Sequence, residues 1–88
     1  MSSLPTKIFP NLFLGDIFDA MNEMGLMQLG ITHILSVGRH TEDESDDFEY
    51  LILEPVLDMP DQDLTQYFDK TYKFIEKARR DGAVLVHW

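Results

Sequence analysis

The chain has 88 residues, a length that allows one small domain burying about two-thirds of its unfolded surface, and no apolar run approaches the roughly 20 residues that span a bilayer. Hydrophobic residues make up 44% of the chain and aromatic residues 11%, a composition typical of folded proteins. The net charge of −9 argues against nucleic acids and anionic membranes as partners, and the lack of cysteine excludes disulfides and a cysteine nucleophile within these residues, so we expect a cytoplasmic or nuclear protein.

The first predicted elements are two short strands joined by a tight turn. Residues 8–9 and 12–14 are apolar, and they flank the turn residues Pro10 and Asn11. The pattern is typical of a β-hairpin at the start of the domain.

A helical stretch is predicted to follow the hairpin, with Asp16 or Asp19 as its N-cap. Gly30, followed by apolar Ile31, is typical of the glycine and hydrophobic contact that end a helix. The buried face of the helix is expected to come from four apolar residues, Met24, Leu26, Met27 and Leu29.

Two more strands are predicted at residues 32–37 and 48–53, which are rich in β-branched and aromatic residues. The segment 39–47 between them is acidic and partly matches a calcium loop. Asp43, Ser45 and Asp47, together with Glu54 further along, have the spacing of calcium ligands in an EF-hand. Phe48 stands where the EF-hand turn needs glycine, so a solvated charged loop is favoured.

The three histidines form no zinc-binding pattern, since their spacings match no known motif and no cysteine supports them. His33 is expected to be a strand residue with one ring nitrogen hydrogen-bonded, and His40 to be a loop residue. His87 ends the last predicted strand. It is either a polar residue at a strand end with no further role, or a functional residue whose role depends on the loop that follows it. We expect no metal and no cofactor.

Asp58 lies in a loop bounded by Pro55 and Pro60. A loop stiffened by proline is able to place a carboxyl group for general acid catalysis. On spacing alone, a turn aspartate facing water is the commoner explanation.

The most strongly specified element is a long helix with Asp63 as its predicted cap, because Asp63 and Gln66 have the spacing of a capping box. Apolar or half-apolar residues recur through it at helical spacing, at Leu64, Tyr67, Phe68, Thr71, Ile75 and Ala78. Gly82 ends the helix, and residues 83–87 are a final strand. The alternation of strands and helices indicates an α/β fold with a small, mainly parallel central sheet and flanking helices.

The order of these segments resembles the dual-specificity branch of the cysteine-dependent protein tyrosine phosphatases, over essentially the whole chain. The compact spacing favours this branch over phosphatases restricted to phosphotyrosine. The resemblance implies that residues 1–88 are a partial dual-specificity phosphatase domain acting on phosphorylated proteins. It is carried by the stretches 8–16, 29–37, 56–58, 63–64, 67–68, 74–75 and 82–87.

In that family the last strand leads into the signature His-Cys-x-x-Gly-x-x-Arg-Ser/Thr, in which the thiolate attacks phosphorus while backbone N–H groups and the arginine hold the phosphate. By resemblance, Asp58 corresponds to the aspartate that protonates the leaving oxygen, and His87 to the signature histidine. Trp88 stands where the family has cysteine. The chain therefore resembles a domain truncated at its signature loop, expected to be inactive; the alternative is a non-catalytic, pseudophosphatase-like interaction module.

The resemblance also implies that elements normally packed around the last strand are missing. We therefore expect residues 84–86 and the apolar face of the helix over 64–78 to be partly uncovered. An exposed apolar strand invites association, so the chain is expected to self-associate through this surface.

Overall fold

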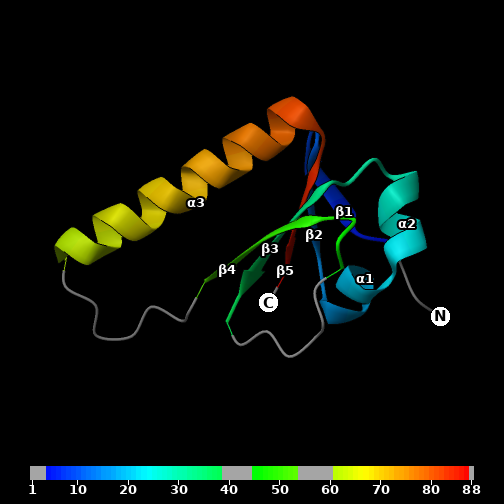
Figure 1. Ribbon diagram of the computed structural model, residues 1–88, viewed down its shortest axis with the longest axis horizontal. Helices are drawn as coiled ribbons and strands as arrows, with labels where there is room; N and C mark the ends of the chain where they lie inside the picture. The colour runs from blue at the N-terminus through cyan, green and yellow to red at the C-terminus, as the bar shows by residue number, and fades with distance from the viewer. Residues whose placement is uncertain (1–3, 39–44, 54–60, 88) are drawn as a thin grey trace.

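The computed structural model describes residues 4–38, 45–53 and 61–87, with the side chains of the last range described from residue 64 onward. The α/β class and the alternation of strands and helices are confirmed (Figure 1). The elements follow in the order β1 (Thr6–Phe9), β2 (Leu12–Gly15), α1 (Ile17–Met21), α2 (Glu23–Gln28), β3 (His33–Val37), β4 (Glu49–Leu53), α3 (Asp61–Asp81) and β5 (Val84–His87).

The strands form one mixed sheet in the order β1-β2-β5-β3-β4. β1 and β2 pair antiparallel as the predicted hairpin, with Asn11 at a φ of 63° in its turn. Every other pairing is parallel, which confirms a mainly parallel sheet.

The last strand of the sequence is central in the sheet, because β2 pairs with β5 on one side and β3 pairs with it on the other. Val84 and Leu85 are 0% exposed. The expectation that these two residues would be partly uncovered is wrong, since Val84 packs against Ala78 of α3 on one face and Leu85 against Leu26 of α2 on the other. Val86 is half-buried, and self-association of the chain stays a prediction.

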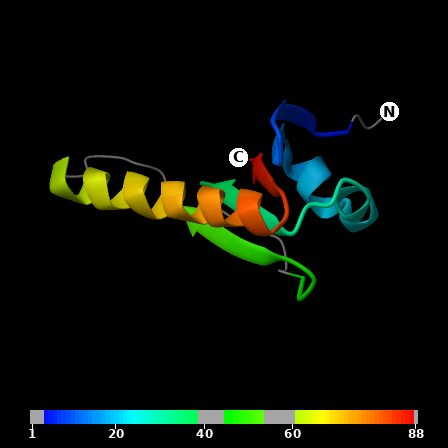
Figure 2. The ribbon, with the colours of Figure 1, turned by 90° about the horizontal axis from the view of Figure 1, so that it is seen from above.

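Two apolar layers cover the sheet on opposite faces, because successive side chains of a strand point to opposite sides. Leu35 and Val84 pack with Ala78 of α3 on one face. Ile34 and Leu85 pack with Leu26 of α2 on the other. Figure 1 shows α3 on one side of the sheet and the short helices on the other, and both views show the first half of α3 extending beyond the strands (Figure 2).

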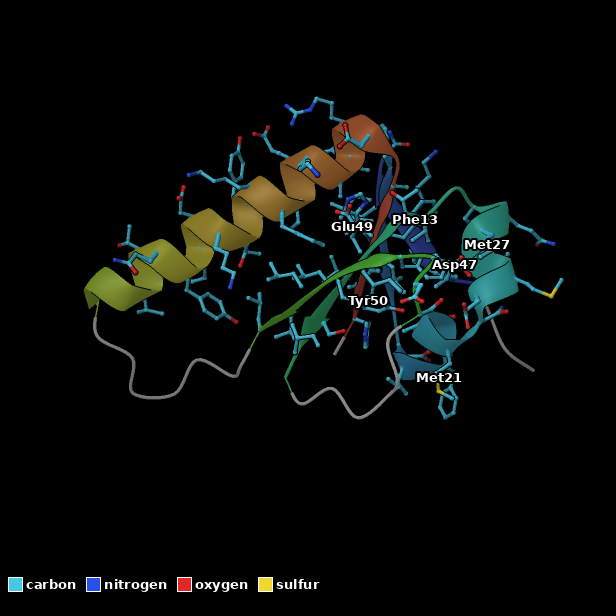
Figure 3. The ribbon with its side chains drawn as sticks, viewed as in Figure 1. Phe13, Met21, Met27, Asp47, Glu49 and Tyr50 are labelled. Atoms are coloured by element: carbon cyan, nitrogen blue, oxygen red, sulfur yellow. The ribbon has the colours of Figure 1, made fainter. Side chains whose placement is uncertain are left out.

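The predicted helix after the hairpin is two helices, with a break at Asn22. Asn22 has φ −89° and ψ 77°, and its side chain accepts a hydrogen bond from the N–H of Gly25, which starts α2 as a new helix. The break changes which residues face inward. Leu26 is buried as predicted, but Met24 and Met27 are 75% and 51% exposed, so their assignment to the buried face is wrong (Met27 is labelled in Figure 3).

The long helix begins three residues earlier than its sequence pattern predicts. α3 starts at Asp61, which places Asp63 inside the first turn and makes its assignment as the N-cap wrong. Within the described residues, no helix combines the length and the apolarity needed to cross a membrane.

Candidate functional site

The parallel strands bring their carboxyl ends to one edge of the sheet. β2, β5, β3 and β4 run in the same direction and end at Gly15, His87, Val37 and Leu53. Ligands of open α/β sheets bind in the crevice outside such carboxyl ends. This edge is therefore the candidate functional site.

One row of residues crosses the sheet at this edge. Gly15 of β2 is in register with His87 of β5, His87 with Ser36 of β3, and Ser36 with Ile52 of β4. Residues in register lie on the same face, so His87 has a glycine on one side and a serine on the other. Asp19 and Leu85 already occupy the space that a side chain at residue 15 would fill.

Ser36 and His87 form a buried polar pair within this row. The Ser36 hydroxyl and Nε2 of His87 are hydrogen-bonded at 2.7 Å, and the two residues are 2% and 3% exposed. Two residues earlier on each strand, and on the same face of the sheet, Ile34 and Leu85 are apolar and buried. Because burying a polar group without a partner is costly, this hydrogen bond offsets part of the cost of burying both groups inside the sheet.

The chain leaves β2 at this edge through a closed capping box. The side chain of Asp16 accepts from the N–H of Asp19 at 2.9 Å, and the side chain of Asp19 accepts from the N–H of Asp16 at 2.9 Å. Asp16 is the N-cap of α1, which confirms one of the two predicted caps. The box fixes the direction of the chain beside His87.

Of the three site residues that the sequence predicts, the structure describes one. His87 is described and lies at the carboxyl edge, as its place at the end of the last strand predicts. Asp58 and Trp88 lie outside the described residues. Asp58 belongs to the segment 54–60 that follows β4, and β4 ends at the same edge as β5.

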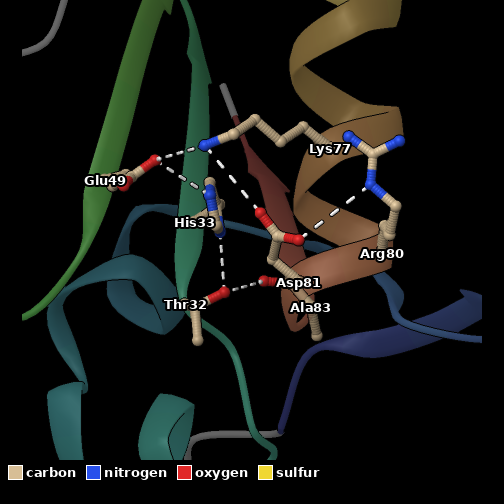
Figure 4. A network of polar contacts seen from close by, with 7 residues as sticks. All are labelled: Thr32, His33, Glu49, Lys77, Arg80, Asp81 and Ala83. Carbon is tan, nitrogen blue, oxygen red and sulfur yellow. Dashed lines mark hydrogen bonds and ion pairs between the residues drawn. The ribbon is translucent and has the colours of Figure 1, made fainter.

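A second polar cluster lies at the opposite edge of the sheet, where β3 and β4 begin (Figure 4). His33 is buried there, with Nδ1 at 2.6 Å from the hydroxyl of Thr32 and Nε2 at 3.0 Å from a carboxylate oxygen of Glu49. The 3.0 Å contact is an ion-pair distance and lacks the angle of a hydrogen bond. One hydrogen-bonded nitrogen on a strand histidine confirms the prediction for His33.

This cluster ties the end of α3 to the sheet. Nζ of Lys77 lies 3.9 Å from Glu49 and 3.8 Å from Asp81. His33 is in register with Val84 and Ser36 with His87, so three residues of strand, about 10 Å, separate the two histidine positions. Among the residues that the structure describes, no three metal-ligating side chains gather. His40, the third histidine of the chain, lies outside those residues.

Sequence reasoning missed Ser36 and Gly15 as members of the site. Ser36 lies two residues after Ile34 in a predicted strand. This spacing predicts only that the two side chains face the same side of the sheet. Pairing with His87 depends on the register between β3 and β5, which are separated in the sequence by β4 and α3.

No protein-family model matches the chain. It is 40% identical over 88 residues to MAP kinase phosphatase with leucine-rich repeats protein 3 of Dictyostelium discoideum, covering 99% of this chain and 10% of the relative. It is 40% identical over 84 residues to dual specificity protein phosphatase 1B of Arabidopsis thaliana, covering 93% of this chain and 50% of the relative. The chain thus spans half or less of these curated relatives.

Solved structures agree with this similarity. The crystal structure of DUSP15 superposes with a TM-score of 0.76 and 34% identity, covering 94% of this chain and 53% of that one. The crystal structure of human DUSP28(Y102H) superposes with a TM-score of 0.78 and 32% identity, covering 98% of this chain and 60% of that one. The similarity therefore extends over nearly all of this chain and part of each solved one.

Proposed function

Because this chain belongs by sequence and fold to the dual-specificity phosphatase family, we propose that residues 1–88 form the N-terminal part of a domain that removes phosphate from proteins phosphorylated on tyrosine, serine or threonine. The observation that carries the proposal is the central position of β5, which presents the buried His87 at the carboxyl edge of the sheet. In the family the phosphate-binding loop follows this strand.

Asp58 is proposed as the general acid of such a domain. It follows β4, whose carboxyl end lies at the same edge as that of β5. A carboxyl group delivered to this edge would donate a proton to the oxygen that leaves phosphorus. General acid catalysis of this kind contributes about 10²- to 10⁴-fold to a rate.

The 88-residue polypeptide by itself is proposed to be inactive. It contains no cysteine, and the indole of Trp88 after His87 is not a nucleophile. We expect no phosphate release above a buffer control from an activated aryl phosphate or a phosphotyrosine peptide. Release abolished by Asp58→Asn would contradict the inactivity of this polypeptide.

A hybrid domain tests the proposal directly. Residues 1–87 would replace the matching part of DUSP15, whose remaining chain supplies the rest of the domain. The hybrid is expected to hydrolyse both an activated aryl phosphate and a phosphotyrosine peptide. Asp58→Asn is expected to lower kcat on the peptide about 10²- to 10⁴-fold and much less on the activated ester, whose leaving group needs no proton.

Asp47→Asn is the matched control, because Asp47 is an exposed aspartate on the segment before β4. It is expected to leave both rates unchanged. If the hybrid folds but releases no phosphate while DUSP15 is active, the non-catalytic interaction module replaces this proposal. An equal loss on both substrates in Asp58→Asn would contradict the role of Asp58 as a general acid.

A further inference from the structure

The hydrogen bond between Ser36 and His87 joins two buried side chains on neighbouring strands. On β2, the residue in register with His87 is Gly15, which has no side chain to form a hydrogen bond with the ring. On β3, the Ser36 hydroxyl lies 2.7 Å from Nε2. Rotation of the imidazole would break this bond inside a row where both residues are almost fully buried.

We propose that Ser36 is a positioning residue, whose buried hydroxyl holds the imidazole of His87 in one orientation at the end of β5. A hydroxyl can donate or accept, so the bond restrains the ring and couples the proton on Nε2 to the direction of the Ser36 O–H. Nδ1, the ring nitrogen closer to the backbone, is thereby held in one position relative to the chain that follows His87. The catalytic meaning of this role rests on the proposed phosphatase function, in which the phosphate-binding loop is that chain.

Ring nitrogen chemical shifts of the 88-residue chain, labelled with ¹⁵N at histidine, test this role. Ser36→Ala is expected to move the Nε2 signal of His87 by several ppm and to change its tautomer ratio. The signals of His33 are the internal control, because His33 lies at the opposite edge of the same sheet with its own partners, Thr32 and Glu49. Ser36→Thr, which restores a hydroxyl, is expected to return the His87 signals towards those of the original chain.

Two further variants keep the test decisive. Ser45→Ala removes a hydroxyl whose oxygen accepts from the N–H of Asp47 in the segment before β4, and it is expected to leave His87 unchanged. If Ser36→Ala does not fold, Ser36→Cys fills nearly the same space with a weaker donor and is expected to move the His87 signals in the same direction.

The proposal is overturned if a folded Ser36→Ala or Ser36→Cys chain keeps the His87 shifts and tautomer ratio of the original. It is also overturned if the His87 and His33 signals move together, since that would report a general loosening of the sheet. Neither result depends on phosphate hydrolysis, so failure here is distinguishable from failure of the hybrid phosphatase.

Discussion

Gly15 lies at the meeting point of β2, α1 and β5, where one added carbon would contact two neighbours. A Cβ at this position would lie 2.9 Å from Cβ of Asp19 and 3.0 Å from a methyl group of Leu85. Asp19 is held there by the capping box with Asp16. The absence of a side chain at residue 15 thus serves both the start of α1 and the core beneath His87.

We expect Gly15→Ala to lower the free energy of unfolding by about 1–2 kcal/mol, because the added methyl displaces Asp19 and opens the capping box. Urea unfolding of Gly15→Ala, Asp19→Ala and the double variant measures this effect. The double variant is expected to lose less than the sum of the two single losses, since the methyl no longer has Asp19 to displace. Strictly additive losses would show that Gly15 acts through another neighbour.

At the residue scale, the sequence predicts those contacts whose two residues lie close together in the sequence. Asp16 is recognised as a cap because its partner Asp19 is three residues away. Ser36 is not recognised, because its partner His87 is 51 residues away and is brought close by strand register. Met24 and Met27 are wrongly predicted as buried because the helical period was continued through Asn22, whose side chain begins a new helix.

At the element scale, α2 ends in a Schellman motif. The N–H of Gly30 donates to the carbonyl of Met27 at 3.1 Å, and the N–H of Ile31 donates to the carbonyl of Leu26 at 2.9 Å. Gly30 has a φ of 77°, and Ile31 is buried after it. The motif turns the chain from the surface helix into β3, which carries Ser36.

Gly30→Ala is expected to cost about 1 kcal/mol of stability, because a side chain in the left-handed region is strained. A Cβ at this position meets nothing within 4 Å, so the cost reports backbone strain alone. Gly30→Asn is the matched control, since asparagine tolerates this conformation and should lose less. Equal losses for alanine and asparagine in urea unfolding would show that strain at φ is not the cause.

At the scale of the whole molecule, the sequence predicts the class and the mainly parallel sheet but not the order of the strands. The alternation of strands with helices follows from local patterns. The central place of β5 requires β2 to pair with it across most of the chain, with Leu12 in register with Val84. Such long-range pairing has no local signal, so the sequence predicts a partly uncovered last strand, whereas Val84 and Leu85 are buried.

The charge of the molecule leads to a prediction for its stability as a function of salt. Acidic residues number 16 against 7 Lys and Arg, which leaves a net charge of −9 on a small fold. The described ion pairs of α3, such as Lys73 with Asp69 at 3.1 Å, are exposed, and such pairs contribute little. Repulsion among the remaining carboxylates therefore destabilises the compact state at low salt.

We expect the melting temperature to rise by several degrees when NaCl increases from about 0.01 M to about 0.15 M, because the screening length falls from about 30 Å to about 8 Å. For a domain of this size, about 1 kcal/mol corresponds to roughly 4–8 °C. Thermal melts followed by circular dichroism measure the shift, and KCl at equal ionic strength separates screening from binding of a particular cation. A melting temperature that falls with salt would mean that local ion pairs, such as Lys77 with Glu49, outweigh the net repulsion.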